Sequence, residues 1–141
     1  MKTYLVTGAA GFIGANYLKY ILKKYADKEE IKVIVVDALT YAGNLGTIRE
    51  ELKNPGVKFE KVDIRDRKEI ERIFSENKVD YVVNFAAESH VDRSIENPQI
   101  FLETNILGTQ NLLDNAKKSW TVSKDENSYP VYREGVKYLQ I

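Results

Sequence analysis

The 141-residue sequence contains no cysteine and only one histidine, His90. This excludes a disulfide framework, a thiolate metal site and a metal site built from several histidines. The 21 basic and 21 acidic residues balance, so the composition points to neither a nucleic-acid surface nor a membrane surface. No apolar run approaches the roughly 18 residues that cross a bilayer. We therefore expect a cytoplasmic protein that binds no metal, no nucleic acid and no membrane.

What the sequence does contain is typical of a globular α/β domain. Apolar residues make up 43% and charged residues 30% of the chain. Strand-like runs alternate with helical patterns, which predicts a doubly wound parallel sheet. The predicted strands are residues 3–7, 32–37, 57–63, 79–87 and 135–141. One helix is predicted after the glycines that follow the first strand, a second after Asp66 as its N-cap, and a third over residues 98–118, beginning at Pro98.

A long polar connection, residues 119–135, joins the last predicted helix to the last predicted strand. Because it runs from a helix into a strand, we expect it at the edge of the sheet opposite the ligand crevice. A surface insertion is favoured there over an active-site lid.

Three glycines, Gly8, Gly11 and Gly14, separate the first predicted strand from the first predicted helix. A strand, a glycine turn and a helix begin a dinucleotide site, because the helix N-terminus attracts phosphates. Gly8 is expected to permit the tight turn, Gly11 to let backbone approach a pyrophosphate, and Gly14 to let helix pack on strand. The G-x-x-G-x-x-G spacing differs from the common G-x-G-x-x-G fingerprint, so the surrounding elements carry the prediction.

Two aspartates end predicted strands on the same side of the sheet. Asp37, after the second strand, is placed to accept hydrogen bonds from adenosine ribose hydroxyls and to repel a 2′-phosphate, which favours NAD over NADP. The alternative is an aspartate that only caps a turn. Asp63, with Ile64, is expected to flank the adenine, and a turn cap is a close alternative there too.

A stretch of small and polar residues, 84–94, leaves the fourth predicted strand at the crevice. Its adjacent alanines leave room for a sugar and a pyrophosphate. The polar cluster behind them is alternatively a solvated loop in which Arg93 pairs with Asp92 or Glu88. A Ser–His–Asp hydrolase is rejected, because three residues of one short loop rarely reach the geometry of a triad.

Several segments stand out together: TGAAGFIG, DALTYAGN, VDIRDR, NFAAESHVDRS and FLETNILGT. In combination they resemble the dTDP-glucose 4,6-dehydratase family of extended short-chain dehydrogenases/reductases. The glycine motif is shared by the whole superfamily, whereas LTYAGN and AAESHVDRS favour the dehydratases. The resemblance spans residues 1–141, with 119–135 least similar. It implies a Rossmann-type NAD-binding domain that is truncated after the fifth strand.

The resemblance also implies which residues line NAD. They are Gly8, Gly11, Phe12, Ile13, Gly14, Asp37, Ala38, Leu39, Thr40, Asp63, Ile64, Phe85, Ala86, Ala87, Glu88, Ser89 and Thr104. Ser89 is further implied to touch the substrate, at the mouth between cofactor and sugar. No catalytic residue and no metal ligand is expected within residues 1–141.

The activity that the resemblance implies is NAD-dependent dehydration of dTDP-glucose to dTDP-4-keto-6-deoxyglucose, in rhamnose-type deoxysugar biosynthesis. The family's Tyr-x-x-x-Lys pair and acid/base group would follow the fifth strand, so residues 1–141 alone are expected to be inactive. Tyr20 and Lys24 match the bare pattern but fall on the first predicted helix. The alternatives are a nucleotide-sugar epimerase or decarboxylase of the same superfamily, and a non-catalytic NAD-binding module.

The longest predicted helix carries two apolar stripes. One holds Leu102, Ile106, Leu113 and Ala116, and the other holds Phe101, Gly108 and Leu112. One stripe is expected to pack on the sheet. The other, tested through Leu112, is expected to pack on the second subunit of a homodimer, as in the family's helix-paired dimers, or else on further chain.

Overall fold

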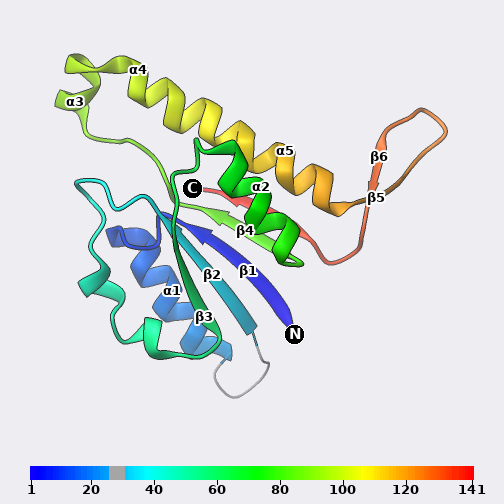
Figure 1. Ribbon diagram of the computed structural model, residues 1–141, viewed down its shortest axis with the longest axis horizontal. Coiled ribbons are helices and arrows are strands. Elements are labelled where there is room, and N and C mark those ends of the chain that lie inside the picture. Colours follow the sequence, from blue (N-terminus) through cyan, green and yellow to red (C-terminus); the bar gives the residue numbers. More distant parts are fainter. Residues whose placement is uncertain (26–30) are drawn as a thin grey trace.

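The computed structural model of the chain describes residues 1–25 and 31–141 (Figure 1). Its central sheet has five strands in the order β3-β2-β1-β4-β7, and every neighbouring pair is parallel. The order reverses between β1 and β4, which is the switch point where ligands bind in such sheets. The strands are β1 (Lys2–Thr7), β2 (Ile31–Asp37), β3 (Val57–Lys61), β4 (Tyr81–Asn84) and β7 (Lys137–Gln140).

Helices cover both faces of this sheet (Figure 1). Helix α1 (Phe12–Tyr25) packs on one face, together with two short helical turns, Leu45–Ile48 and Glu51–Lys53. Helices α2 (Arg67–Glu76) and α5 (Thr109–Trp120) pack on the other. Residues 33–36 of β2 are fully buried, because alternate side chains enter the two cores. The predicted doubly wound α/β class is confirmed.

The strand predicted over residues 79–87 ends at Asn84, because the side chain of Asn84 turns the chain. Its Oδ1 accepts hydrogen bonds from the hydroxyl of Thr7 and, at 3.1 Å, from the N–H of Ala86. Its Nδ2 donates to Oε1 of Gln140 on β7, at 2.9 Å. The buried amide therefore joins three neighbouring strands and releases the next residues as a loop above the sheet.

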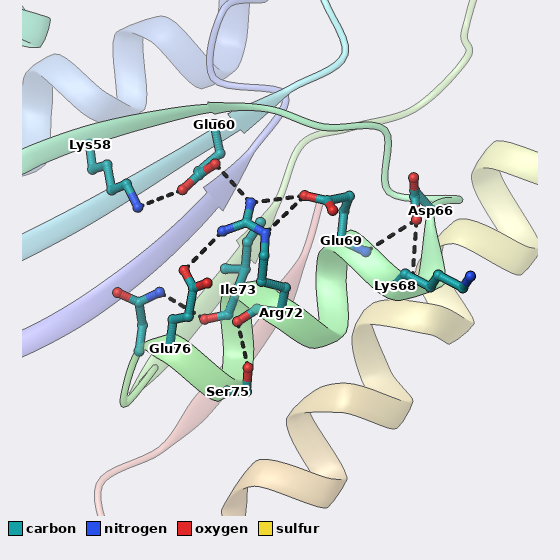
Figure 2. Close-up of polar contacts among 10 residues, drawn as sticks. Lys58, Glu60, Asp66, Lys68, Glu69, Arg72, Ile73, Ser75 and Glu76 are labelled. Atoms are coloured by element: carbon teal, nitrogen blue, oxygen red, sulfur yellow. Dashed lines mark hydrogen bonds and ion pairs between the residues drawn. The ribbon is translucent and has the colours of Figure 1, made fainter.

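Helix α2 is tied to β3 by the ion pairs in Figure 2. Asp66 caps the helix as predicted, since its Oδ1 accepts from two N–H groups of the first turn, both at 3.1 Å. The guanidinium of Arg72 lies 2.9 Å from Glu60 of β3 and also pairs with two glutamates of its own helix. Hydrogen bonds from Lys58 and Arg72 lower the pKa of Glu60. These contacts hold the turn between β3 and α2 at the edge of the sheet.

The helix predicted over 98–118 begins at Pro98 as expected but changes its pitch. Helix α4 (Pro98–Phe101) continues through a π-helical segment, Leu102–Gly108, into α5. The wider π turns shift the register of the side chains. The buried face consists of Gly108, Asn111, Leu112, Ala116 and Trp120, whereas Leu102, Ile106 and Leu113 are exposed.

The assignment of Leu112 to a subunit interface is therefore wrong, because this side chain is fully buried in the core under α5. Ala116 likewise belongs to the core and not to the stripe of Leu113. The sequence offered two apolar stripes, and local periodicity does not tell which of them faces the sheet, because that depends on how the helix packs in the assembled fold.

The polar connection 119–135 forms an antiparallel hairpin of β5 (Thr121–Lys124) and β6 (Pro130–Tyr132), which projects from the end of α5 (Figure 1). Arg133 anchors it through an ion pair to Asp80, with 2.6 Å between Nη1 and Oδ1. Asp80 lies just before β4, so the hairpin sits at the edge opposite the carboxyl ends of the strands, as predicted. In the ranges that the structure describes, no helix has the length and apolarity needed to cross a membrane.

Candidate functional site

A cleft of about 460 Å³ opens above the carboxyl ends of β1 to β4. Its walls are the glycine turn, the segments that follow β2 and β3, the loop after β4 and the start of the long helix. Every residue that the sequence assigned to cofactor binding lines this cleft, apart from Leu39. The N–H of Leu39 instead donates to Oδ1 of Asp37, at 2.8 Å. The fold thus gathers the predicted site, and the contacts of these residues with a cofactor stay a prediction.

The three glycines of the turn have different surroundings. Gly8 has a φ of +67°, and a Cβ there would lie 2.6 Å from the backbone nitrogen of Ala86. A Cβ on Gly14 would collide with the carbonyl oxygen of Gly8 and lie 2.8 Å from Cα of Ala9. A Cβ on Gly11 would meet one atom, 3.3 Å away, and this residue lines the cleft. The fold needs Gly8 and Gly14, whereas Gly11 leaves space for a ligand.

Helix α1 presents its N-terminus to the cleft. Phe12 and Ile13 form its first turn, where N–H groups have no preceding carbonyl of the helix to bond. The helix dipole adds a partial positive charge at the same place. Although both side chains are apolar, both are exposed at the mouth of the cleft, Phe12 by 84%. This end of the cleft is suited to an anion such as a phosphate.

Asp37 links two walls of the cleft. Its Oδ2 accepts a hydrogen bond of 2.9 Å from the N–H of Ala10 in the glycine turn, and its Oδ1 accepts the one from Leu39. Asp37 therefore caps a turn, as the alternative interpretation stated. Each carboxylate oxygen has capacity for a second hydrogen bond, and Asp37 lines the cleft. The same side chain can hold the turn and receive the hydroxyls of a ligand.

Asp63 also caps a turn, as the alternative for that residue stated. Its Oδ1 accepts from the N–H of Arg65 at 2.9 Å, and its Oδ2 lies 2.7 Å from the guanidinium of Arg65. Burial alone would raise the pKa of Asp63, but the hydrogen bonds from Arg65 lower it. Arg65 pairs in addition with Glu103, 3.1 Å away in the π segment. These pairs fix the wall of the cleft beyond β3, where Ile64 lies.

The loop after β4 is held by an asparagine that sequence reasoning missed. The N–H of Glu88 donates to Oδ1 of Asn105, and Nδ2 of Asn105 donates to the carbonyl of Glu88, both at 2.8 Å. Asn105 lies in the π segment, directly after the predicted Thr104. Its place within FLETNILGT was the available signal, but nothing in the spacing identified its partner.

Arg93 does not form the ion pairs suggested for it. Within the described ranges neither Asp92 nor Glu88 pairs with its guanidinium, which instead stacks 4.0 Å from the ring centre of Tyr41. The imidazole of His90 meets the same ring edge-on at 6.2 Å. Tyr41 follows β2, and Arg93 belongs to α3 (Val91–Glu96) after β4. The stack connects the segment after β2 with the segment after β4, both of which contribute other residues to the cleft.

A doubly wound sheet whose glycine turn, strand-end aspartate and small-residue loop meet at the switch point defines a Rossmann-type protein. A family model described as GDP-mannose 4,6 dehydratase matches residues 5–132. The chain belongs to this family.

Curated relatives of the chain are sugar-nucleotide dehydratases by name. The dTDP-glucose 4,6-dehydratase of Neisseria meningitidis serogroup B is 48% identical over 120 residues, which are 85% of this chain and 33% of that protein. The Xanthomonas campestris pv. campestris enzyme of the same name is 42% identical over the whole chain, which covers 37% of it. The chain thus spans little more than a third of the length of the curated relatives it matches.

A solved structure shows the same fold. The dTDP-glucose 4,6-dehydratase of Streptomyces venezuelae, determined with NAD bound, superimposes with a TM-score of 0.75 at 37% identity. The match covers 92% of this chain and 45% of that chain.

Proposed function

We propose that residues 1–141 are the NAD-binding domain of an enzyme that dehydrates dTDP-glucose to dTDP-4-keto-6-deoxyglucose, in rhamnose-type deoxysugar biosynthesis. The observation that carries the proposal is the cleft itself, in which Gly11, Asp37 and the loop after β4 face one space at the switch point. The names of the relatives support the substrate and the reaction. The cytoplasmic location expected from the sequence stays a prediction.

The chemistry of the cleft fits a dinucleotide. Asp37 would hold the adenosine ribose, and the N-terminus of α1 would hold the pyrophosphate above Gly11. Asp63 and Ile64 would flank the adenine, and Thr104 and the loop 85–89 would line the remaining half, with Ser89 touching the sugar at the mouth. Bound NAD would supply the oxidant for the sugar, while the residues of this chain position it.

The test of this proposal is the Asp37→Ala variant. Removal of a charge-assisted hydrogen bond is expected to weaken NAD binding by about 1.5–3 kcal/mol, or roughly ten- to a hundredfold. Calorimetric titration of the 141-residue chain with NAD and with NADP measures the change. Unchanged affinity for NAD in the variant, or a parent that prefers NADP, contradicts the assigned role.

Asp66→Ala is a matched control for this experiment. It also removes a carboxylate that accepts backbone hydrogen bonds, but it does so at the start of α2, and Asp66 does not line the cleft. Loss of this cap is expected to cost about 1 kcal/mol of stability and to leave NAD affinity unchanged. An equal loss of NAD binding in both variants would show that Asp37 acts through stability alone.

We further propose that the full-length enzyme is a homodimer whose interface includes the exposed stripe of Leu102, Ile106 and Leu113. Ile106 is 57% exposed although it is a large apolar residue. Ile106→Glu is expected to convert the dimer into a monomer, because a charge would be buried at the interface. Sedimentation velocity measures this, with Val122→Glu on the exposed hairpin as the control. A variant that sediments as an unchanged dimer would exclude this stripe.

A further inference from the structure

Two side chains at the start of α3 hold the ring of Tyr41, which lies on the segment after β2. The guanidinium of Arg93 stacks on this ring, 4.0 Å from its centre, and the imidazole of His90 meets it edge-on. We call Tyr41, His90 and Arg93 the strap. None of the three is among the described residues that line the cleft, although Thr40 and Ser89 beside them are.

The strap ties α3 to the segment after β2. Within the described ranges no residue of α3 or α4 is buried, and Val91 and Ile95 of α3 are 69% and 76% exposed. An element that buries so little apolar surface gains little from packing, so it opens locally at a low cost in free energy. A single cation–π contact is then a sizeable part of what holds α3 in place.

The strap also closes a ring of contacts around the carboxyl end of β1, which lies between β2 and β4 in the sheet. The N–H of Asn44, after β2, donates to the carbonyl of Ala10 in the glycine turn at 3.1 Å. At the end of β4, Asn84 accepts a hydrogen bond from the hydroxyl of Thr7 on β1. The strap completes the ring beyond the carboxyl ends of the strands, where Figure 1 shows α3.

A dinucleotide bound as proposed lies across the same strand end. Its adenosine ribose, on Asp37, belongs to the β2 side, its pyrophosphate lies at the N-terminus of α1 above β1, and its second nucleoside belongs to the β4 side. The strap runs in the same direction, from the segment after β2 to the segment after β4. Ligand and strap thus span the same gap, and a closed strap obstructs the exit of the ligand.

We propose that the strap is a gate over the dinucleotide cleft, so that its opening lets NAD enter and leave and its closure slows both steps. The inference rests on the proposed NAD-binding function and adds a kinetic role for residues that do not line the cleft. Because they do not line it, their contact holds the closed form alike with and without NAD. Its loss therefore speeds association and dissociation by the same factor and leaves the affinity unchanged.

The rates at which the 141-residue chain binds and releases etheno-NAD, a fluorescent form of NAD, test the gate. Tyr41→Leu removes the ring, and both rates are expected to rise together by about two- to fivefold, which corresponds to the loss of one exposed cation–π contact. Tyr41→Phe keeps the ring and is expected to retain the rates of the parent. Stopped-flow mixing measures association, and displacement by excess NAD measures dissociation.

A cross-link is expected to give a larger effect, and the sequence contains no cysteine that would compete with the introduced pair. The double variant Tyr41→Cys, Arg93→Cys is joined by a bifunctional methanethiosulfonate, whose disulfides a reductant cleaves. Etheno-NAD is expected to enter the linked chain at least about tenfold more slowly than the reduced one, because entry then requires a larger local unfolding. Etheno-NAD bound beforehand is expected to leave correspondingly slowly, and reduction to restore both rates.

Tyr20→Leu is a matched control. Lys24 lies 5.5 Å from the ring centre of Tyr20 on α1, and neither is among the described residues that line the cleft. The variant breaks a contact of the same kind away from the proposed gate, and both rates are expected to stay those of the parent.

The inference is overturned if Tyr41→Leu keeps the rates of the parent, if it loses affinity for NAD with association unchanged, or if Tyr20→Leu accelerates exchange equally. It is also overturned if the linked chain exchanges etheno-NAD as fast as the reduced one. A parent chain that binds neither NAD nor etheno-NAD contradicts the proposed function. A parent that binds both, with variants that keep its rates, contradicts the gate alone.

Discussion

Replacement of Gly11 with valine is expected to abolish NAD binding by the 141-residue chain and to leave its fold intact. A Cβ on Gly11 would meet only the carbonyl oxygen of Gly8, at 3.3 Å, so a small adjustment accommodates it. The two methyl groups of the valine would then occupy the space in which the pyrophosphate must approach the turn. We expect the dissociation constant for NAD to rise at least about a hundredfold.

Gly14→Val is the matched comparison, since it adds the same side chain to the same turn. Its Cβ would collide with the backbone of Gly8 and Ala9, where nothing flexible can move aside. We expect the free energy of unfolding to fall by about 4 kcal/mol or more and the melting temperature to fall by at least roughly 10 °C. Circular dichroism measures stability and calorimetry measures binding. If folded Gly11→Val retains the NAD affinity of the parent, the glycines serve only the turn.

The second large effect concerns catalysis. The 141-residue chain is expected to form no measurable 4-keto-6-deoxy sugar from dTDP-glucose in the presence of NAD. No tyrosine, lysine or histidine is among the described residues that line the cleft. Tyr20 and Lys24 interact with each other on α1, with 5.5 Å between the ammonium and the ring centre, and do not line it. A positioned proton-transfer group contributes about 10²–10⁴-fold to the rate, so its loss takes turnover below detection.

Mass-spectrometric assay of the sugar nucleotide tests this expectation. The dTDP-glucose 4,6-dehydratase of Neisseria meningitidis, treated in the same way, is the positive control. NAD binding by the 141-residue chain, measured in parallel, separates an inactive binding domain from a misfolded one. Product formed by the purified chain, after its mass has been verified, would show that residues 1–141 carry catalytic groups of their own.

Much of the candidate site follows from local patterns in the sequence. The apolar run before Gly8, the helical periodicity after Gly14 and the strand ending at Asp37 locate a strand, a turn, a helix and an acid in that order. Parallel strands place their carboxyl ends at one edge, so the residues after each strand had to meet. The N-cap at Asp66 could equally be predicted from the sequence, because an N-cap depends on hydrogen bonds to residues that are close in the chain.

The parts that sequence reasoning missed depend on distances between segments that are remote in the chain. The stack of Arg93 on Tyr41 and the pairing of Asn105 with Glu88 join residues from different elements. The assignment of Leu112 to an interface has a related cause, since the choice of which helix face packs on the sheet depends on the assembled fold and not on the helical period.

The sequence by itself determined the fold class of this protein, because the alternation of strand-like and helical hydrophobic patterns and the residues of the turns are local properties. Tertiary packing did not reverse the strands and helices that they predict. Only the tertiary structure decided which turn glycines serve the fold and which serves the cleft, since that depends on how closely Gly8 and Gly14 approach other backbone atoms. It alone decided that Glu88 is buried, with no donor to its Oε2 among the residues that the structure describes, because burial is a property of the assembled layers and not of the residue's neighbours in the chain.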